Sequence, residues 1–233
     1  MRKIILLIVL FITANSIHAH DCHKQLVKCP IDNTEIEFCV VTGSIAYGNY
    51  TDFQQQVDMD DFYEGQIKSC PKCHFSGYYY DFSALYNEKE KKDVLEILSK
   101  YNDVKIDDAK ECEIAGTIKE FFKEANDKIA NCYLIGSYVL KKKSKKAVYR
   151  KELQKKAAYF LIKAVNNQEY ADQAETIAIN YLIAEMYRRT GDFKNALKYY
   201  DEVLTSKKIT AWLEEMTPIQ KELAKGKDDT NDI

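Results

Sequence analysis

The chain has 233 residues, of which 46% are hydrophobic and 30% are charged, and it contains only 3 prolines and 8 glycines. This composition is typical of one or two globular domains and excludes long disordered segments. The formal net charge is -2. A balance so close to neutral excludes binding of nucleic acid through the overall charge of the protein.

The first residues have the order of a secretory signal peptide. Arg2 and Lys3 precede an apolar run at 4–13, and small and polar residues follow up to Ala19. This order predicts a signal peptide over 1–19 and a mature chain that begins at His20, with cleavage after Ser16 as the second choice. The apolar run is too short for a comfortable membrane span. We therefore expect an exported protein, periplasmic or secreted, without a stable membrane span once the signal is removed.

The front third of the mature chain is rich in cysteine and contains all of its histidines. These residues are Cys22, Cys29, Cys39, Cys70, Cys73, His20, His23 and His74. The segment 34–41, TEIEFCVV, alternates apolar and polar residues well enough to be a strand. We expect residues 20–87 to form a small, irregular, β-containing module.

Two short motifs in this module carry metal-ligand chemistry, CPID at 29–32 and CPKC at 70–73. In a zinc ribbon, two such knuckles at hairpin tips each present a pair of ligands to a tetrahedral site. Asp32 stands where a second cysteine is expected, and a carboxylate oxygen can bind zinc at about 2.0–2.2 Å. The predicted ligands are Cys29, Asp32, Cys70 and Cys73. Alternatives for the fourth ligand are Cys39, His74, Cys22 and His23.

Beyond residue 88 the apolar residues recur with the period of helices. Apolar positions between Ile114 and Gly136 predict one long helix, and a further helix starts near Leu153. The segment 177–204 reads as a helical hairpin of the tetratricopeptide type, with a tight turn at Gly191-Asp192. Residues 126–166 look like an earlier, degenerate copy of it.

The sequence thus predicts an α+β fold, in which a zinc-ribbon-like module precedes an all-α, tetratricopeptide-like domain over 88–224. Small residues let paired helices approach closely, so we expect Ala157 and Ala196 at helix contacts. A helix containing Trp212 closes the array, and residues 225–233 form a polar tail that we expect to fray.

The order of these motifs resembles the bacterial family called domain of unknown function 2225. The resemblance covers nearly all of the mature chain. It rests on CPIDNTEIEF at 29–38, Asp58-Met59-Asp60 with Tyr63, CPKCHFSGYYYDF at 70–82, YLIAEMYRRTGDFKNALKYYDEVL at 181–204 and AWLEE at 211–215. The resemblance implies a metal knuckle followed by helical repeats. It assigns no activity, because the function of the family is itself unassigned. Asp32 in place of a thiolate and the predicted export signal depart from what we expect of the family.

Two other interpretations of the cysteines remain open. In an exported protein, Cys29, Cys39, Cys70 and Cys73 are candidates for disulfides, which would staple the module without a metal. The spacing of Cys70 and Cys73 also fits a thiol oxidoreductase, but no βαβ setting or facing proline loop accompanies it. Cys112 and Cys132 read as small core residues.

The sequence favours a non-enzymatic binding or scaffold protein. Stacked hairpins form a concave surface suited to a protein or peptide partner, and zinc would be structural. Tyr138, Tyr181 and Tyr187 would suit a peptide groove, although they could equally pack between hairpins. The alternative is a thiol redox or metal-dependent enzyme that uses Cys70 and Cys73.

Overall fold

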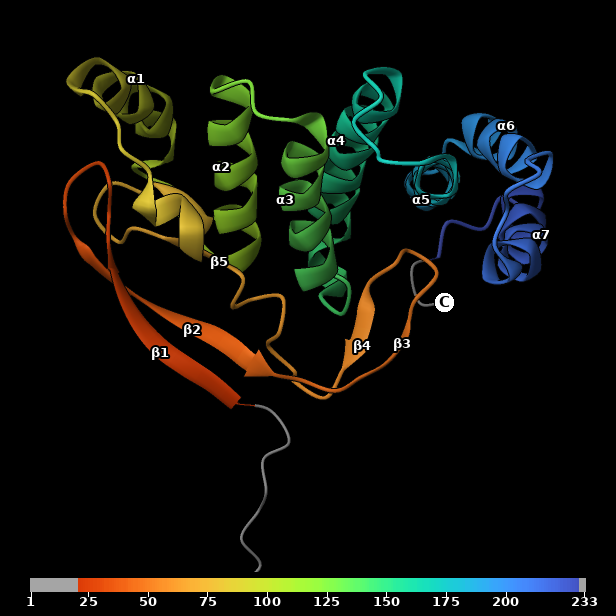
Figure 1. The fold of residues 1–233 in the computed structure, drawn as a ribbon, viewed down its shortest axis with the longest axis horizontal. Helices are drawn as coiled ribbons and strands as arrows, with labels where there is room; N and C mark the ends of the chain where they lie inside the picture. Colours follow the sequence, from red (N-terminus) through yellow and green to blue (C-terminus); the bar gives the residue numbers. More distant parts are fainter. Residues whose placement is uncertain (1–20, 231–233) are drawn as a thin grey trace, which may run out of the picture.

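The computed structural model describes residues 21–230. The signal peptide predicted over 1–19 and the expected start at His20 lie outside the described residues. The chain has the predicted α+β architecture, with strands first and helices after them. In Figure 1 the helices follow one another across the molecule from α1 to α7, and the β1–β2 and β3–β4 pairs run along one side of that row.

The strands form three separate antiparallel pairs, β1–β2, β3–β4 and β5–β6. Their bounds are β1 Asp21–Lys28, β2 Glu35–Gly43, β3 Ala46–Asn49, β4 Gln55–Val57, β5 Ile67–Ser69 and β6 Ser76–Tyr78. The strand predicted over 34–41 is confirmed as β2. Ile36 and Phe38 are buried, whereas Glu35 and Glu37 are exposed. One face of the β1–β2 pair therefore packs on the core while the other meets water.

The described chain also contains seven α-helices and three short 3-10 helices. Their bounds are η1 Tyr79–Ser83, α1 Glu88–Leu98, η2 Ser99–Tyr101, α2 Asp108–Phe121, α3 Asn126–Val139, η3 Ser144–Lys146, α4 Ala147–Asn166, α5 Gln173–Thr190, α6 Phe193–Leu204 and α7 Ala211–Lys225. From α2 onward, each helix packs against the next. None of the helices in residues 21–230 has the length and hydropathy of a membrane span.

The single long helix predicted between Ile114 and Gly136 is wrong. It is two helices, because α2 ends at Phe121 and α3 starts at Asn126. Lys123 adopts a left-handed φ of 54°, and the Glu124 N–H donates to the Lys119 carbonyl at 3.0 Å. This closing bond is the usual stop of a helix that ends on a left-handed residue. A lysine takes the position that glycine normally marks.

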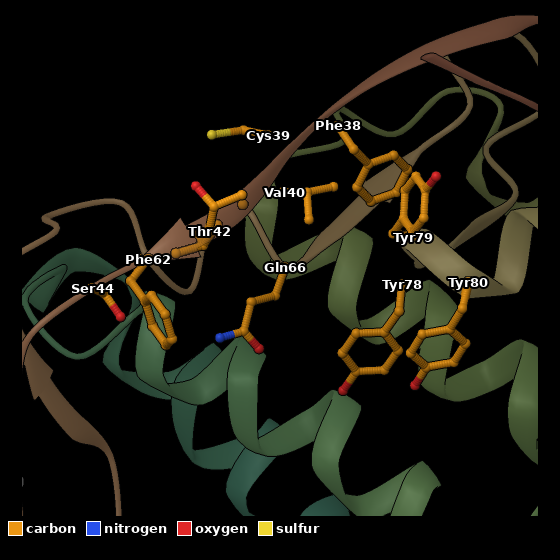
Figure 2. A pocket seen from close by; sticks show the side chains of 13 residues that line it. Phe38, Cys39, Val40, Thr42, Ser44, Phe62, Gln66, Tyr78, Tyr79 and Tyr80 are labelled. Atoms are coloured by element: carbon orange, nitrogen blue, oxygen red, sulfur yellow. The ribbon is translucent and has the colours of Figure 1, made fainter. Parts of the chain in front are cut away.

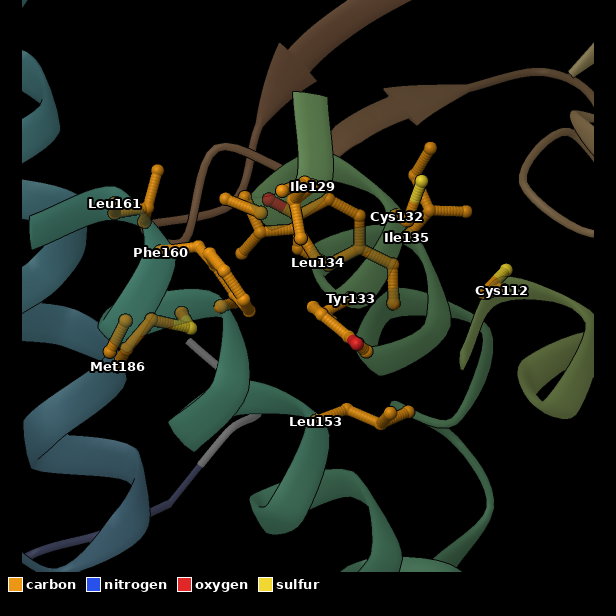
Figure 3. Close-up of a cluster of buried hydrophobic side chains, with 14 of the residues drawn as sticks. Cys112, Ile129, Cys132, Tyr133, Leu134, Ile135, Leu153, Phe160, Leu161 and Met186 are labelled. Atoms are coloured by element: carbon orange, nitrogen blue, oxygen red, sulfur yellow. The ribbon is translucent and has the colours of Figure 1, made fainter. Parts of the chain in front are cut away.

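The largest core cluster lies between α2, α3, α4 and α5. Figure 3 shows Tyr133 of α3 and Phe160 of α4 within it; their rings stack with centroids 5.9 Å apart. A Cβ atom on Gly116 would lie 2.7 Å from Cζ of Tyr133, so a larger residue at 116 would displace the Tyr133 ring from its place between α2 and α3. Ala157 is fully buried in the same cluster, as predicted for a close helix contact.

A second core cluster joins the strands to the first helices. Cys29, Phe38 and Phe75 come from the front module, while Leu98 and Ile114 come from α1 and α2. A module of about sixty residues buries little apolar surface by itself. Sharing a core with α1 and α2 gives it the packing partners that it lacks.

The third cluster lies between α5, α6 and α7 and contains Ala196, which is fully buried as predicted. The tail that follows is held up to Thr230, contrary to the expectation that it frays. Arg188 donates from Nη1 to the carbonyls of Asp228 and Thr230, both at 3.0 Å. The guanidinium is itself buried, so these two carbonyls complete the hydrogen bonding of a charge that water does not reach.

Candidate metal centre

The first knuckle is the tight turn between β1 and β2. The Cys29 N–H donates to the Thr34 carbonyl at 2.8 Å, and the Asn33 N–H donates to the Cys29 carbonyl at 2.9 Å. Asn33 has a left-handed φ of 62°, a conformation that asparagine tolerates better than most residues. The turn places Cys29 and Asp32 side by side.

The second knuckle, between β5 and β6, repeats this turn bond for bond. The Cys70 N–H donates to the Phe75 carbonyl at 2.8 Å, and the His74 N–H donates to the Cys70 carbonyl at 2.9 Å. His74 has a φ of 63°, close to that of Asn33. Asp32 therefore occupies in the first knuckle the position of Cys73 in the second.

The two turns meet, and one ligand atom from each of Cys29, Asp32, Cys70 and Cys73 lies within 4.8 Å of all the others. The Sγ atoms of Cys29 and Cys73 are 3.5 Å apart, and Cys70 Sγ lies 3.5 Å from Oδ1 of Asp32. Zinc–sulfur bonds of about 2.3 Å in a tetrahedron place sulfurs about 3.8 Å apart. The donor set and its spacing thus fit a tetrahedral cation.

The four candidate ligands differ in the direction in which their pKa values are shifted. A hydrogen bond with the Cys73 thiol lowers the pKa of Cys29 to about 7, while the same bond and burial raise the pKa of Cys73. Burial raises the pKa of Cys70. Burial also opposes ionisation of Asp32, but hydrogen bonds from Thr34 and the thiols outweigh it and lower its pKa. A divalent cation at the centre would displace the protons of Cys70 and Cys73.

The alternative ligands lie elsewhere. Cys39 forms a disulfide with Cys22, so neither is available as the fourth ligand. The disulfide partner of Cys39 is therefore Cys22 and not Cys29, Cys70 or Cys73, the candidates named from the sequence. No histidine belongs to the group of close ligand atoms found in residues 21–230. His74 contributes its backbone to the second knuckle. Cys112 and Cys132 are buried thiols in the helical core.

Comparison with known proteins identifies the family. Residues 23–225 match "Uncharacterized protein conserved in bacteria (DUF2225)", the domain of unknown function 2225. The chain belongs to this family. No curated protein and no solved structure matches it. The match spans both knuckles and all seven α-helices of residues 21–230, so the candidate metal ligands and the helical array both lie within the matched residues.

The three tyrosines proposed for a groove have other contacts in this family member. Tyr181 is fully buried, and its ring packs 5.6 Å from that of Phe53 in the turn between β3 and β4. Tyr138 donates its hydroxyl to the Asp52 carbonyl at 2.6 Å, and Tyr187 packs on Tyr199. Tyr181 therefore packs inside the protein, as in the second of the two interpretations, and does not line an open groove.

A buried charge cluster, which the sequence analysis missed, lies beside these tyrosines. Arg189 of α5 pairs with Asp52 at 2.9 Å and with Glu185 at 2.9 Å, and Glu185 also pairs with Arg188 at 3.0 Å. Lys141 pairs with Asp52 at 3.1 Å. The available signal was the spacing of Glu185, three and four residues before two arginines on a largely apolar helix. These ion pairs fix the tip of the β3–β4 hairpin on the helices.

Proposed function

We propose that Cys29, Asp32, Cys70 and Cys73 bind a structural zinc ion in a non-enzymatic, exported binding or scaffold protein. One observation carries the metal assignment: two turns with the same hydrogen bonds bring three thiols and a carboxylate together. A site that encloses the metal with four protein ligands leaves no position for substrate. The proposal therefore assigns the zinc a role in stability and no role in a reaction.

Burial favours this role over thiol exchange. Cys29 and Cys70 have no exposed surface and belong to the core cluster shared with α1 and α2, and Cys73, which is partly exposed, packs against that cluster. A redox thiol has to meet its partner's disulfide, which requires access. Because Cys29 and Cys73 are in contact, thiol exchange and a disulfide are the two alternatives to zinc binding. The metal content of the purified protein distinguishes zinc binding from both alternatives. Protein without metal and with these cysteines bonded to each other would support the disulfide alternative.

Substitution of Asp32 tests the fourth ligand. Asp32→Ala should weaken zinc binding by more than about tenfold, since loss even of an outer-shell partner costs that much. Asp32→Cys should retain zinc, because the first knuckle then matches the second and completes a four-thiolate site. The exposed Asp60 provides the control, and Asp60→Ala should leave the affinity unchanged. Equal affinities for wild type and Asp32→Ala, measured by competition with a chromogenic chelator, would remove Asp32 from the site.

Two observations support export. The leader at 1–19 has the order of a signal peptide, and the Cys22–Cys39 disulfide belongs to an oxidising compartment. Mass spectrometry of the protein recovered outside the cytoplasm should give a chain that starts at His20. An intact Met1 would contradict the proposal.

The helical array supports the binding role. Stacked helices α2 to α7 present an extended surface of the kind that repeat proteins use for protein or peptide partners. The β3–β4 hairpin already covers part of this surface through Asp52 and Phe53. A partner therefore meets helices and hairpin together, and its binding should be lost when the hairpin tip is released from α5.

A further inference from the structure

A second candidate site lies outside the metal centre, between β2 and residues 78–80, where β6 ends and η1 begins. It is a cavity of about 590 Å³ lined by 13 residues, drawn in Figure 2. None of these residues is Asp, Glu, Lys, Arg or His, although 30% of the chain is charged. A cavity of the same volume on the helices includes Asp127 and Lys128. The lack of charge is thus a property of this cavity rather than of cavities in this protein generally.

One wall of the cavity is built from tyrosines held in place from behind. The rings of Tyr78 and Tyr80 stack with centroids 5.3 Å apart and planes 9° apart. Buried Lys119, which pairs with Asp81 at 2.8 Å, lies 5.8 and 5.9 Å from the two ring centroids. Asn131 donates to the Tyr78 hydroxyl at 2.8 Å. The wall is therefore ordered before any ligand arrives, which lowers the entropic cost of binding.

The opposite wall is apolar and one amide lies between the two. Alternate residues of β2 share a face, and Figure 2 shows Val40 on the cavity side of the strand with Cys39 on the other side. Gln66 extends from the turn before β5 into the space between the walls. Tyr80 remains 62% exposed. An aromatic surface that is both ordered and exposed is typical of binding sites.

We propose that this cavity binds an uncharged, largely apolar ring compound. Its ring would pack on the Tyr78–Tyr80 wall and its opposite side on Val40, while the Gln66 amide would bond one polar substituent. A charged ligand would leave water for a cavity without a countercharge, and that desolvation is costly. The volume lies within the range of small-molecule sites, about 300–1,000 Å³. Neither the metal centre nor the partner surface requires this site.

The first test compares two fluorescent probes that share a naphthalene skeleton. N-phenylnaphthylamine is uncharged, whereas anilinonaphthalene sulfonate has a permanent negative charge. Titration of the full mature chain should show saturable binding of one uncharged probe per protein. The sulfonate should bind weaker by about tenfold or more, because its charge finds no partner in the cavity. Equal affinity for the two probes, or no saturation, would overturn the proposal.

Matched substitutions locate the bound probe. Val40→Asp introduces a charge at a half-buried position of the wall, and Leu26→Asp introduces it on the neighbouring strand at a side chain that is 69% exposed. Val40→Asp should weaken binding of the uncharged probe by about tenfold or more, and Leu26→Asp should leave it unchanged. Similarly, Tyr80→Ala should weaken binding whereas Tyr159→Ala, on α4, should not.

Two further results would overturn the proposal. If each pair of variants binds the probe equally, the probe lies elsewhere. If wild type is a dimer that Val40→Asp and Tyr80→Ala dissociate, with probe binding only to the monomer, the cavity holds a second copy of the chain instead. Sedimentation of the wild type and both variants measures this directly, and a monomeric wild type is the result that we expect.

Discussion

Glu185→Gln should destabilise the protein by about 3–5 kcal/mol, the cost of breaking a buried ion pair from one side. Glu185 has no exposed surface and accepts hydrogen bonds from Arg188 and Arg189 of its own helix and from the Tyr200 hydroxyl. Glutamine keeps the size of the side chain but removes the charge and turns an acceptor into a donor that faces other donors. The positive charges of Arg188 and Arg189 would then remain buried without the negative charge of Glu185 to balance them.

Urea unfolding of the mature chain measures this effect, and Glu202→Gln is the control. Glu202 is exposed and 3.7 Å from Lys198, so its substitution should change the free energy of unfolding by less than about 0.5 kcal/mol. A loss below about 1 kcal/mol for Glu185→Gln would mean that water reaches the cluster. Arg189 and Arg188 outweigh burial and lower the pKa of Glu185. The stability that it contributes is therefore present above its unfolded-state pKa and lost as pH falls through its folded-state pKa.

Removal of the proposed zinc should have an effect of similar size on the stability of the front module. Free zinc at a thousand times its dissociation constant stabilises the folded state by about 4 kcal/mol, and a chelator removes that contribution. Cys70→Ser should abolish the response of the melting temperature to the chelator. Cys112→Ser, a change at an equally buried thiol outside the cluster, should leave the response intact. A wild-type melting temperature that ignores both zinc and chelator would contradict the structural role.

The same site predicts the direction of the pH dependence. The pKa values of Cys70 and Cys73 are raised, so both thiols are protonated near neutral pH, and zinc has to displace about two protons as it binds. Affinity should fall as pH falls, since the protonated thiols compete with the metal. Titration calorimetry in two buffers with different ionisation enthalpies counts the protons released. Proton uptake on binding would contradict the assignment of these two thiols as ligands.

The sequence predicted what depends on local patterns. Alternation identified β2, the repeated CP motif identified both knuckles, and Gly191 identified the turn between α5 and α6. The end of α2 was missed because Lys123 adopts the left-handed conformation that glycine marks elsewhere. Gln168 and Lys227 adopt the same conformation after α4 and α7. No glycine or proline marks the stops of α2 and α4, whereas Gly226 directly follows α7.

Contacts between distant segments were beyond the sequence. Nothing local distinguishes Asp52 from the other acidic residues around it, because its partners Lys141 and Arg189 lie 89 and 137 residues away. The role of Tyr181 depends on Phe53 in the same way. Periodicity finds the buried face of a helix but cannot say which strand or turn covers it. The uncharged cavity was missed for this reason, since its walls come from β2 and from residues 78–80.

The hairpin tip also determines when the molecule can finish folding. The bond between Arg189 and the Thr51 hydroxyl joins residues separated by 138 positions, so the contacts of the tip remain incomplete until α5 has formed, although Tyr138 and Lys141 already bind Asp52. Contacts of such high sequence separation slow folding, because the entropy of closing the loop is lost before the contact stabilises anything. During synthesis, β3 and β4 would form an isolated two-stranded hairpin, which is marginal in water, until Tyr138 and Lys141 supply its first contacts with the helices. Amide hydrogen exchange should then show the hairpin reaching its full protection only together with α5, after α2, α3 and α4.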